Sequence, residues 1–187
     1  MHFSRFFVVS AAAATGTAMP TSESSGTNTF DIIAIHSSSG VQNAAFNAVN
    51  AAKNSLFAGL SDQGASCARP KEQSATFYIQ DGALYLYDIS ATSQEIYVDR
   101  SDMGQGKIGY TTGAQPTPRN VEREGWAIKD SHLEFDGSSL IACPNSIDGT
   151  WSIWASAGVQ NPGGNKDCVG VAARVIYSGL YKENGRK

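Results

Sequence analysis

His36 and His132 have side chains that could bind a metal ion or act in catalysis. His36 lies among serines, and His132 is followed two positions later by Glu134. In an extended strand such neighbours share one face, and an imidazole beside a carboxylate is suited to metal binding or general base catalysis. A solvated strand face of mixed charge is the favoured interpretation, because one histidine on a strand lacks the dense ligand spacing of a zinc site. The sequence therefore predicts no metal site and no cofactor.

Sequence motifs of enzymes give little support for catalysis. The segment GQGKIG at 104–109 matches the letters of a dinucleotide-binding loop, but no helix-forming segment follows it, so a glycine-rich hairpin turn is favoured. No nucleophile elbow, zinc-protease motif or Cys-x-x-Cys motif occurs. Most of the many acidic residues fall where turns are expected. We predict a protein that is not an enzyme, and a carbohydrate hydrolase with two catalytic carboxylates is the less favoured alternative.

Several aromatic residues fall on predicted outer strand faces. Alternation sends Tyr85, Tyr87 and Trp154 outward, together with Tyr78 and Tyr97. Exposed rings beside hydroxyl or amide groups are suited to stacking on sugars, and they also mark protein contact sites. The plainer interpretation, which we weigh above both, is that a second layer or a loop covers the rings. Tyr85, Tyr87 and Trp154 are the candidate residues for binding a carbohydrate or a partner.

Two similar hairpins are expected to position these side chains. The segment TFYIQDGALYL at 76–86 returns 49 residues later as GWAIKDSHLEF at 125–135. Asp-Gly in the first copy is a strong signal for a two-residue turn, whose central residues both need positive φ. Asp-Ser takes the turn in the second copy. The residues predicted to face inward are Phe77, Ile79, Leu84 and Leu86 in the first copy and Trp126, Ile128, Leu133 and Phe135 in the second.

The whole chain reads as short strands separated by turn residues. Candidate strands lie at 31–36, 45–49, 56–60, 76–79, 84–87, 95–98, 107–110, 125–128, 132–135, 140–143, 151–155 and 169–177. Such spacing is typical of an all-β sandwich or barrel. We predict a compact β-barrel or two-sheet sandwich of about twelve short strands with hairpin repeats. A β-trefoil of three four-strand units is less favoured, because the first third of the chain matches the repeat poorly.

The start of the chain indicates export. Arg5 precedes the apolar run FFVVSAAAA and small residues follow, which is typical of a secretory signal at 1–18. We expect a flexible leader at 19–29 and one all-β domain at 30–187, beginning with a strand in which Ile33 and Ile35 alternate with smaller or polar residues. A formal net charge of −3 is too small to indicate nucleic acid or an anionic membrane as partner. We therefore predict a soluble, secreted protein.

Three cysteines follow the predicted signal, at Cys67, Cys143 and Cys168. An oxidising compartment makes at least one disulfide expected. We favour Cys143 with Cys168, because that bridge would close a loop of about 25 residues and contribute about 3 kcal/mol through chain entropy. It would also tether the loop rich in Gly and Pro between them. Cys67 is then left buried, capped or paired between chains.

Several blocks of the sequence resemble one fungal family. They are FDIIAIHS, IYVDRSDMGQGKIGYTTG, LIACP, GTWSIWA and DCVGVAARVIYS, in that order. Together they resemble the fungal PhiA-like secreted cell-wall proteins, a family associated with phialide and conidium formation and with allergens. The resemblance implies that Cys143 and Cys168 correspond to the later cysteine pair of the family. Only Cys67 stands in the region where the family usually has an earlier pair.

The resemblance implies a secreted protein of the cell wall, with no catalytic residues to carry over. We predict contact with wall polysaccharide and involvement in wall or spore development. The alternative is a secreted elicitor or allergen that a host receptor or antibody recognises. Neither nucleic acid nor a membrane is an expected partner.

Overall fold

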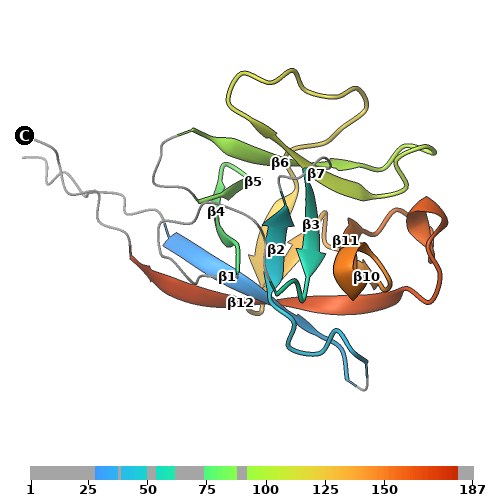
Figure 1. Cartoon of the computed structure of the whole chain (residues 1–187). Coiled ribbons are helices and arrows are strands. Elements are labelled where there is room, and N and C mark those ends of the chain that lie inside the picture. The colour runs from blue at the N-terminus through green and yellow to red at the C-terminus, as the bar shows by residue number, and fades with distance from the viewer. Residues whose placement is uncertain (1–27, 38, 50–53, 62–73, 88–91, 181–187) are drawn as a thin grey trace, which may run out of the picture.

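The structure, a computed structural model, describes residues 28–37, 39–49, 54–61, 74–87 and 92–180. Within them the chain forms twelve β-strands, two short 3-10 helices and no α-helix (Figure 1). The strands are β1 (Asn28–Ile35), β2 (Phe46–Val49), β3 (Ser55–Ala58), β4 (Thr76–Gln80), β5 (Ala83–Leu86), β6 (Gln94–Asp99), β7 (Lys107–Thr112), β8 (Trp126–Lys129), β9 (His132–Phe135), β10 (Leu140–Cys143), β11 (Trp151–Ala155) and β12 (Val169–Leu180). The predicted all-β class is confirmed, and every candidate strand overlaps an observed one. The 3-10 helices are η1 (Ile147–Gly149) and η2 (Pro162–Gly164).

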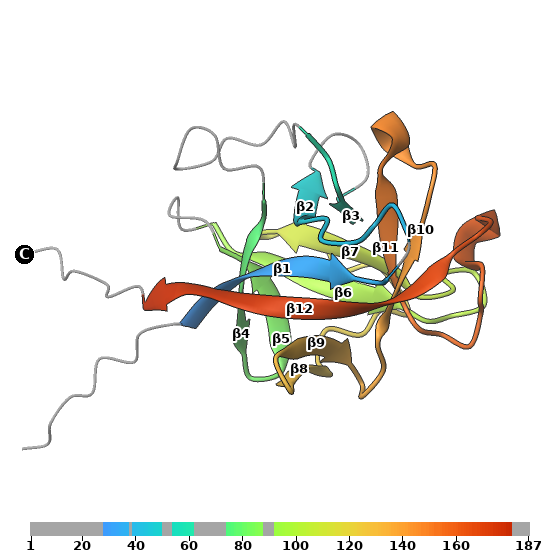
Figure 2. The ribbon, with the colours of Figure 1, turned by 90° about the horizontal axis from the view of Figure 1, so that it is seen from below.

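The strands close into a barrel through antiparallel pairing. The hydrogen-bonded path runs β1-β4-β5-β6-β7-β3-β11-β10-β12 and returns to β1 through the long β1–β12 pairing. Figure 2 shows β1 and β12 running together across the barrel. Strands β9 and β8 continue from β12, and β2 pairs with β3. Closure of the path leaves few open strand edges, and of the predicted barrel and sandwich it is the barrel that is observed.

The pairings also group the strands into three units of four. The middle strands of each unit form a hairpin, namely β2–β3, β6–β7 and β10–β11. These three hairpins are joined to one another by the pairings β3–β7, β7–β11 and β3–β11. The outer strands are joined by β4–β5, β8–β9 and β12–β1. This is the order expected for the less favoured trefoil, and it includes the first third of the chain despite the poor sequence match there.

The two repeated hairpins supply matching inner faces, as predicted. Phe77 pairs with Leu86 in β4–β5, and Trp126 pairs with Phe135 in the same register of β8–β9. All four side chains are buried in the barrel core. Leu84 and Leu133 are also buried, whereas their partners Ile79 and Ile128 are half-buried and pack against the core.

The turns of both hairpins have the predicted backbone. Asp81 and Gly82 have φ of 52° and 79°, and Asp130 and Ser131 have φ of 49° and 63°. Positive φ at both central residues matches the right-handed twist of the flanking strands. The second turn therefore places a serine in a conformation that favours glycine.

Strand β1 begins earlier than the sequence predicted, and both of its faces carry apolar residues. The strand begins at Asn28, two residues before the predicted start of the domain at residue 30. Its buried face carries Phe30 and Ile32, whereas Ile33 and Ile35 are only half-buried. Both faces of this strand carry apolar residues, so alternation identified the strand but not the inward side.

A disulfide joins Cys143 at the end of β10 to Cys168 beside the start of β12, as predicted. Cys67, the predicted signal and most of the leader lie outside the described residues. Among the described residues, none of the helices has the length and apolar character that crossing a membrane requires.

Candidate binding groove

A surface groove of about 710 Å³ lies where the three hairpins β2–β3, β6–β7 and β10–β11 meet. Its walls come from β3, β6, β7 and β11 and from the loops on either side of the disulfide. Its lining includes the polar or aromatic side chains of Asn54, Tyr97, Lys107, Ser152, Trp154 and Asn165. The groove therefore combines the rings of Tyr97 and Trp154 with amide and hydroxyl groups from different parts of the chain.

Strand register explains why Tyr97 and Trp154 reach the same groove. Tyr97 on β6 lies opposite Gly109 on β7. Lys107, two residues before Gly109, lies opposite Asp99 on β6 and opposite Trp154 on β11. Residues opposite each other in an antiparallel pair point to the same side of the sheet. The alternate residues of β6 and β11 are buried in the core. The outer face of these strands is thus the floor of the groove.

The rings of Tyr97 and Trp154 each rest against a glycine. A Cβ on Gly109 would clash with the Tyr97 ring, and a Cβ on Gly163 would clash with the Trp154 ring. The indole nitrogen of Trp154 also donates to Ser152 Oγ at 2.9 Å. Close backbone contact on one side fixes the orientation of each ring while the ring lines the groove.

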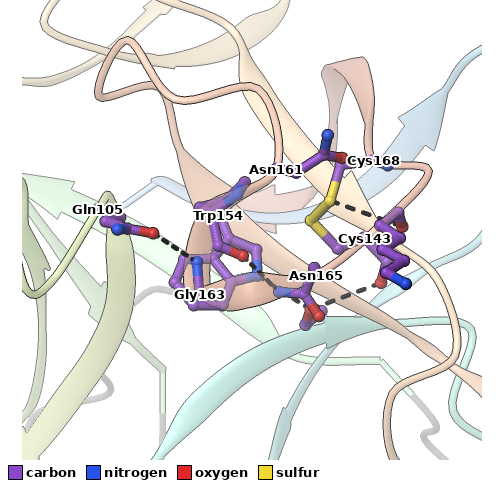
Figure 3. Close-up of a disulfide and its surroundings, with 10 residues drawn as sticks. Gln105, Cys143, Trp154, Asn161, Gly163, Asn165 and Cys168 are labelled. Carbon is purple, nitrogen blue, oxygen red and sulfur yellow. Dashed lines mark hydrogen bonds between the residues drawn. A yellow bond between two sulfur atoms is a disulfide. The ribbon is translucent and has the colours of Figure 1, made fainter.

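The loop that carries Gly163 is held in place from several directions (Figure 3). The backbone N–H of Gly163 donates to Gln105 Oε1 at 2.8 Å, which links the loop to the β6–β7 turn. Asn161 Oδ1 accepts from the backbone N–H of Cys168 at 3.1 Å, and the disulfide ties Cys168 to Cys143. The bridge therefore tethers the loop, as the sequence predicted, and holds it against the groove.

The electrostatics of the groove are mild. Burial raises the pKa of Tyr97 and the nearby carboxylate of Asp99 raises it further, so the phenol stays protonated and can donate a hydrogen bond at neutral and acidic pH. Lys107 is the one charged side chain among the described lining residues, and Asp99 is its cross-strand neighbour. A nearly neutral groove with ring faces, amides and hydroxyls is suited to a neutral, hydroxyl-rich ligand.

The structure separates the three candidate residues that the sequence predicted. Trp154 lines the groove, whereas Tyr85 and Tyr87 lie with Tyr78 in a tyrosine cluster on the outer face of β4–β5. The rings of Tyr78 and Tyr85 stack with centroids 5.0 Å apart, and Tyr87 meets Tyr78 edge-on at 6.5 Å. All the cluster rings are half-buried. Burial raises the pKa of Tyr78 and Tyr85, and Glu95 raises both further.

Sequence reasoning placed Tyr97 on an outer face but did not connect it with Trp154. The two residues are distant along the chain, and the β6–β7 and β7–β11 pairings bring them together. Lys107 and Asn165 gave no local signal of a role in binding. The glycines at Gly109 and Gly163 were the available signal, because each leaves room for an aromatic ring.

The two histidines that the sequence singled out, His36 and His132, lie in a backbone contact and on a strand face, respectively. No group of three or more His, Cys, Asp or Glu side chains could hold a metal ion within the described part of the chain. His36 Nδ1 lies 2.8 Å from the carbonyl oxygen of Gly170, a contact between the end of β1 and β12. His132 and Glu134 lie half-buried on the same side of β9.

The chain matches known fungal proteins over most of its length. The sequence profile of the PhiA-like secreted protein family matches residues 30–181. The "Cell wall protein phiA" of Aspergillus fumigatus is 65% identical over 170 residues, which cover 90% of each chain. The protein of that name from Aspergillus niger is 62% identical over 168 residues, or 89% of this chain and 90% of the relative. That of Arthroderma benhamiae is 41% identical over 135 residues, or 68% and 73%. No solved structure matches the chain with significance.

The fold and the groove define a β-barrel protein with a nearly neutral, aromatic-lined surface groove. The chain belongs to the PhiA-like secreted protein family. The resemblance seen in the sequence is confirmed, and so is the predicted secretion. None of the relatives named above carries the name of an enzyme.

Proposed function

We propose that this protein is a non-enzymatic component of the fungal cell wall that contacts wall polysaccharide through the groove at Tyr97 and Trp154. The names of its relatives, which are cell wall proteins, support the location. The observation that carries the ligand is the presence of two glycine-backed rings beside amide and hydroxyl groups in one groove. Sugar rings present C–H faces that stack on aromatic rings and hydroxyls that bond to amides.

The groove supports binding better than hydrolysis. Glycoside cleavage needs two carboxyl groups, about 5–10 Å apart, on either side of the scissile bond. The described residues that line the groove include no Asp and no Glu. We therefore propose that bound polysaccharide is retained and not cleaved.

Recognition by a host receptor or antibody is the second candidate function. The segment 113–120 is exposed throughout its length, and a disulfide cross-links the barrel that carries this segment. Exposed loops on a stable domain favour recognition by antibodies. Binding of serum antibody to the intact protein, compared with a variant in which 113–120 is shortened, would test this function.

Retention on insoluble wall polysaccharide tests the primary proposal. Purified protein is incubated with β-glucan and with chitin, and the bound fraction is compared for the native chain, Tyr97→Ala and Trp154→Ala. We expect each substitution to weaken retention about fivefold or more, because a stacking contact contributes about 1 kcal/mol or more. Tyr177→Ala is the matched control, since Tyr177 is 60% exposed and lies on β12, outside the groove lining.

Retention equal in all four proteins would contradict the role of the groove. Thermal unfolding of each variant separates loss of binding from loss of the fold. Conversion of Tyr97 to Phe keeps the ring and removes the phenol, so it shows how much of the binding depends on the hydrogen bond.

A further inference from the structure

We propose that the binding surface extends beyond the groove as an aromatic track of Tyr78, Tyr85, Tyr97 and Trp154. The track crosses five neighbouring strands, β4, β5, β6, β7 and β11. We further propose that its ligand is a linear, neutral polysaccharide chain several sugars long. This inference rests on the proposed function and specifies the ligand of the same site.

Strand register places the tyrosine cluster on the outer face that forms the groove. Tyr78 lies opposite Tyr85 in the β4–β5 pairing, and Tyr85 lies opposite Glu95 in the β5–β6 pairing. Glu95 and Tyr97 are two residues apart on β6, so their side chains point to the same side. The cluster and the groove are therefore parts of one surface.

The length of the track decides the kind of ligand. Across the sheet, Tyr85 and Trp154 are separated by three strand-to-strand steps, β5–β6, β6–β7 and β7–β11. Along the strands they are offset by four residues, because Tyr85 lies opposite Glu95 whereas Trp154 is in register with Asp99 through Lys107. Strand spacing near 4.8 Å and a rise near 3.3 Å per residue give a separation of roughly 20 Å along the surface. One sugar ring is much shorter than this, so a ligand that contacts both ends is a chain.

The middle of the track is polar and balanced in charge. The guanidinium of Arg123 pairs with the carboxylate of Glu95, and it donates to Thr111 Oγ1 at 3.0 Å and to Thr117 Oγ1 at 2.8 Å. The Arg123 charge therefore neutralises that of Glu95. The ion pair and hydroxyls supply hydrogen-bonding groups between the two aromatic ends.

Charge complementarity favours a neutral chain over a polyanion or a polycation. Along the track Glu95 is paired with Arg123, and Lys107 lies opposite Asp99 in the β6–β7 register, so two positive and two negative charges offset one another. A polyanion would be favoured by an excess of cations, and a polycation by an excess of carboxylates. A neutral polysaccharide needs neither, because stacking and hydroxyl contacts supply its binding energy.

Binding of soluble oligosaccharides of increasing length tests the track. Calorimetry with β-glucan and chitin oligosaccharides compares the native chain with a double variant, Tyr78→Ala and Tyr85→Ala. We expect the native affinity to increase with chain length until the track is filled. The double variant should bind short oligosaccharides as the native chain does but lose about tenfold of the affinity for long ones.

Matched variants keep the test independent of folding. Tyr85→Phe preserves the ring and should keep the gain with chain length, and Tyr177→Ala should keep it as well. Trp154→Ala should weaken binding of short and long chains alike, since it lies in the groove.

The possible results distinguish the inference from the proposed function. Native affinity that does not depend on chain length, together with loss of binding in Trp154→Ala, would overturn the track and leave the groove in place. A double variant that loses short and long chains equally would also overturn the track. Absence of binding by any oligosaccharide, soluble or insoluble, would overturn both proposals.

Discussion

The hairpins β4–β5 and β8–β9 have the same inner faces and different outer faces. The inner pair Phe77 and Leu86 of the first hairpin corresponds to Trp126 and Phe135 of the second, at the same register. Both pairs are buried in one core, where large apolar side chains are required at these positions. The inner faces are therefore fixed by the needs of the barrel.

The outer faces of these hairpins are not constrained in this way. Tyr78 lies opposite Tyr85 in the first hairpin, and Ala127 lies opposite Glu134 at the corresponding positions of the second. A residue on the outer face of a barrel strand contributes little to the core, so its type is free to serve another purpose. The comparison indicates that the two hairpins supply equivalent inner faces to the barrel, whereas the residue types of their outer faces are free to differ.

Truncation of matched core residues would test the likeness of the inner faces. Leu84 and Leu133 are both fully buried at corresponding positions. We expect Leu84→Ala and Leu133→Ala each to lower the free energy of unfolding by about 2–5 kcal/mol, through lost burial and a cavity. Chemical denaturation measures both, and the outer substitution Ala127→Ser is the control. A large cost at one leucine and a negligible one at the other would break the comparison.

Removal of the disulfide should destabilise both hairpins together. Replacing Cys143 and Cys168 with Ala opens a loop of 25 residues and should cost about 3 kcal/mol of unfolding free energy. This cost should add to that of Leu84→Ala and of Leu133→Ala, because the barrel unfolds as one unit. Denaturant midpoints of the double and combined variants measure the sum. Equal midpoints for the oxidised and reduced native protein would contradict the expectation.

The sequence was sufficient for features that depend on local patterns. Alternation and turn residues located the strands and both hairpin turns, because positive φ at Asp81 and Gly82 follows from residue type alone. The pairing of Cys143 with Cys168 was predicted from loop length and confirmed.

Features that depend on distant pairing could not be predicted in this way. The meeting of Tyr97 with Trp154 requires β7 to pair with both β6 and β11, which no local pattern encodes. The grouping of the strands into three units could not be seen in the sequence for the same reason, since the first unit keeps the pairings without keeping the residues. Both faces of β1 carry apolar residues, so the sequence did not show which face packs into the core.

Exchange of the turn residues would sharpen the comparison of the hairpins. Gly82 and Ser131 occupy the same turn position, with φ of 79° and 63°. The left-handed region costs residues with a Cβ about 1 kcal/mol or more, and glycine adopts it freely. We expect Ser131→Gly to raise the free energy of unfolding by about 1 kcal/mol and Gly82→Ser to lower it by a similar amount. Opposite signs in thermal denaturation are the required result, and the same sign for both would count against equivalent turns.

The smallest expected effect concerns an ion pair at the edge of the second hairpin. The Arg100 guanidinium lies 5.2 Å from the centre of the Phe135 ring and donates from Nε to Glu122 Oε1 at 2.8 Å. This hydrogen bond holds the pKa of Glu122 below its ordinary value of 4.5. A lowered pKa in the folded state stabilises the fold above the unfolded pKa, and that contribution disappears as the pH falls through the folded pKa.

Glu122→Gln should therefore remove part of the acid dependence of stability. The side chains of Arg100 and Glu122 are 31% and 41% exposed, so solvent screening limits the contribution to about 0.5 kcal/mol at neutral pH. Below the folded pKa the native chain and the variant should converge in unfolding midpoint. Glu124→Gln removes the same charge at an exposed position of the same segment and is the matched control. A Glu122→Gln midpoint that stays below the native one by a constant amount at every pH would show that lost packing, and not the ionised carboxylate, accounts for the difference.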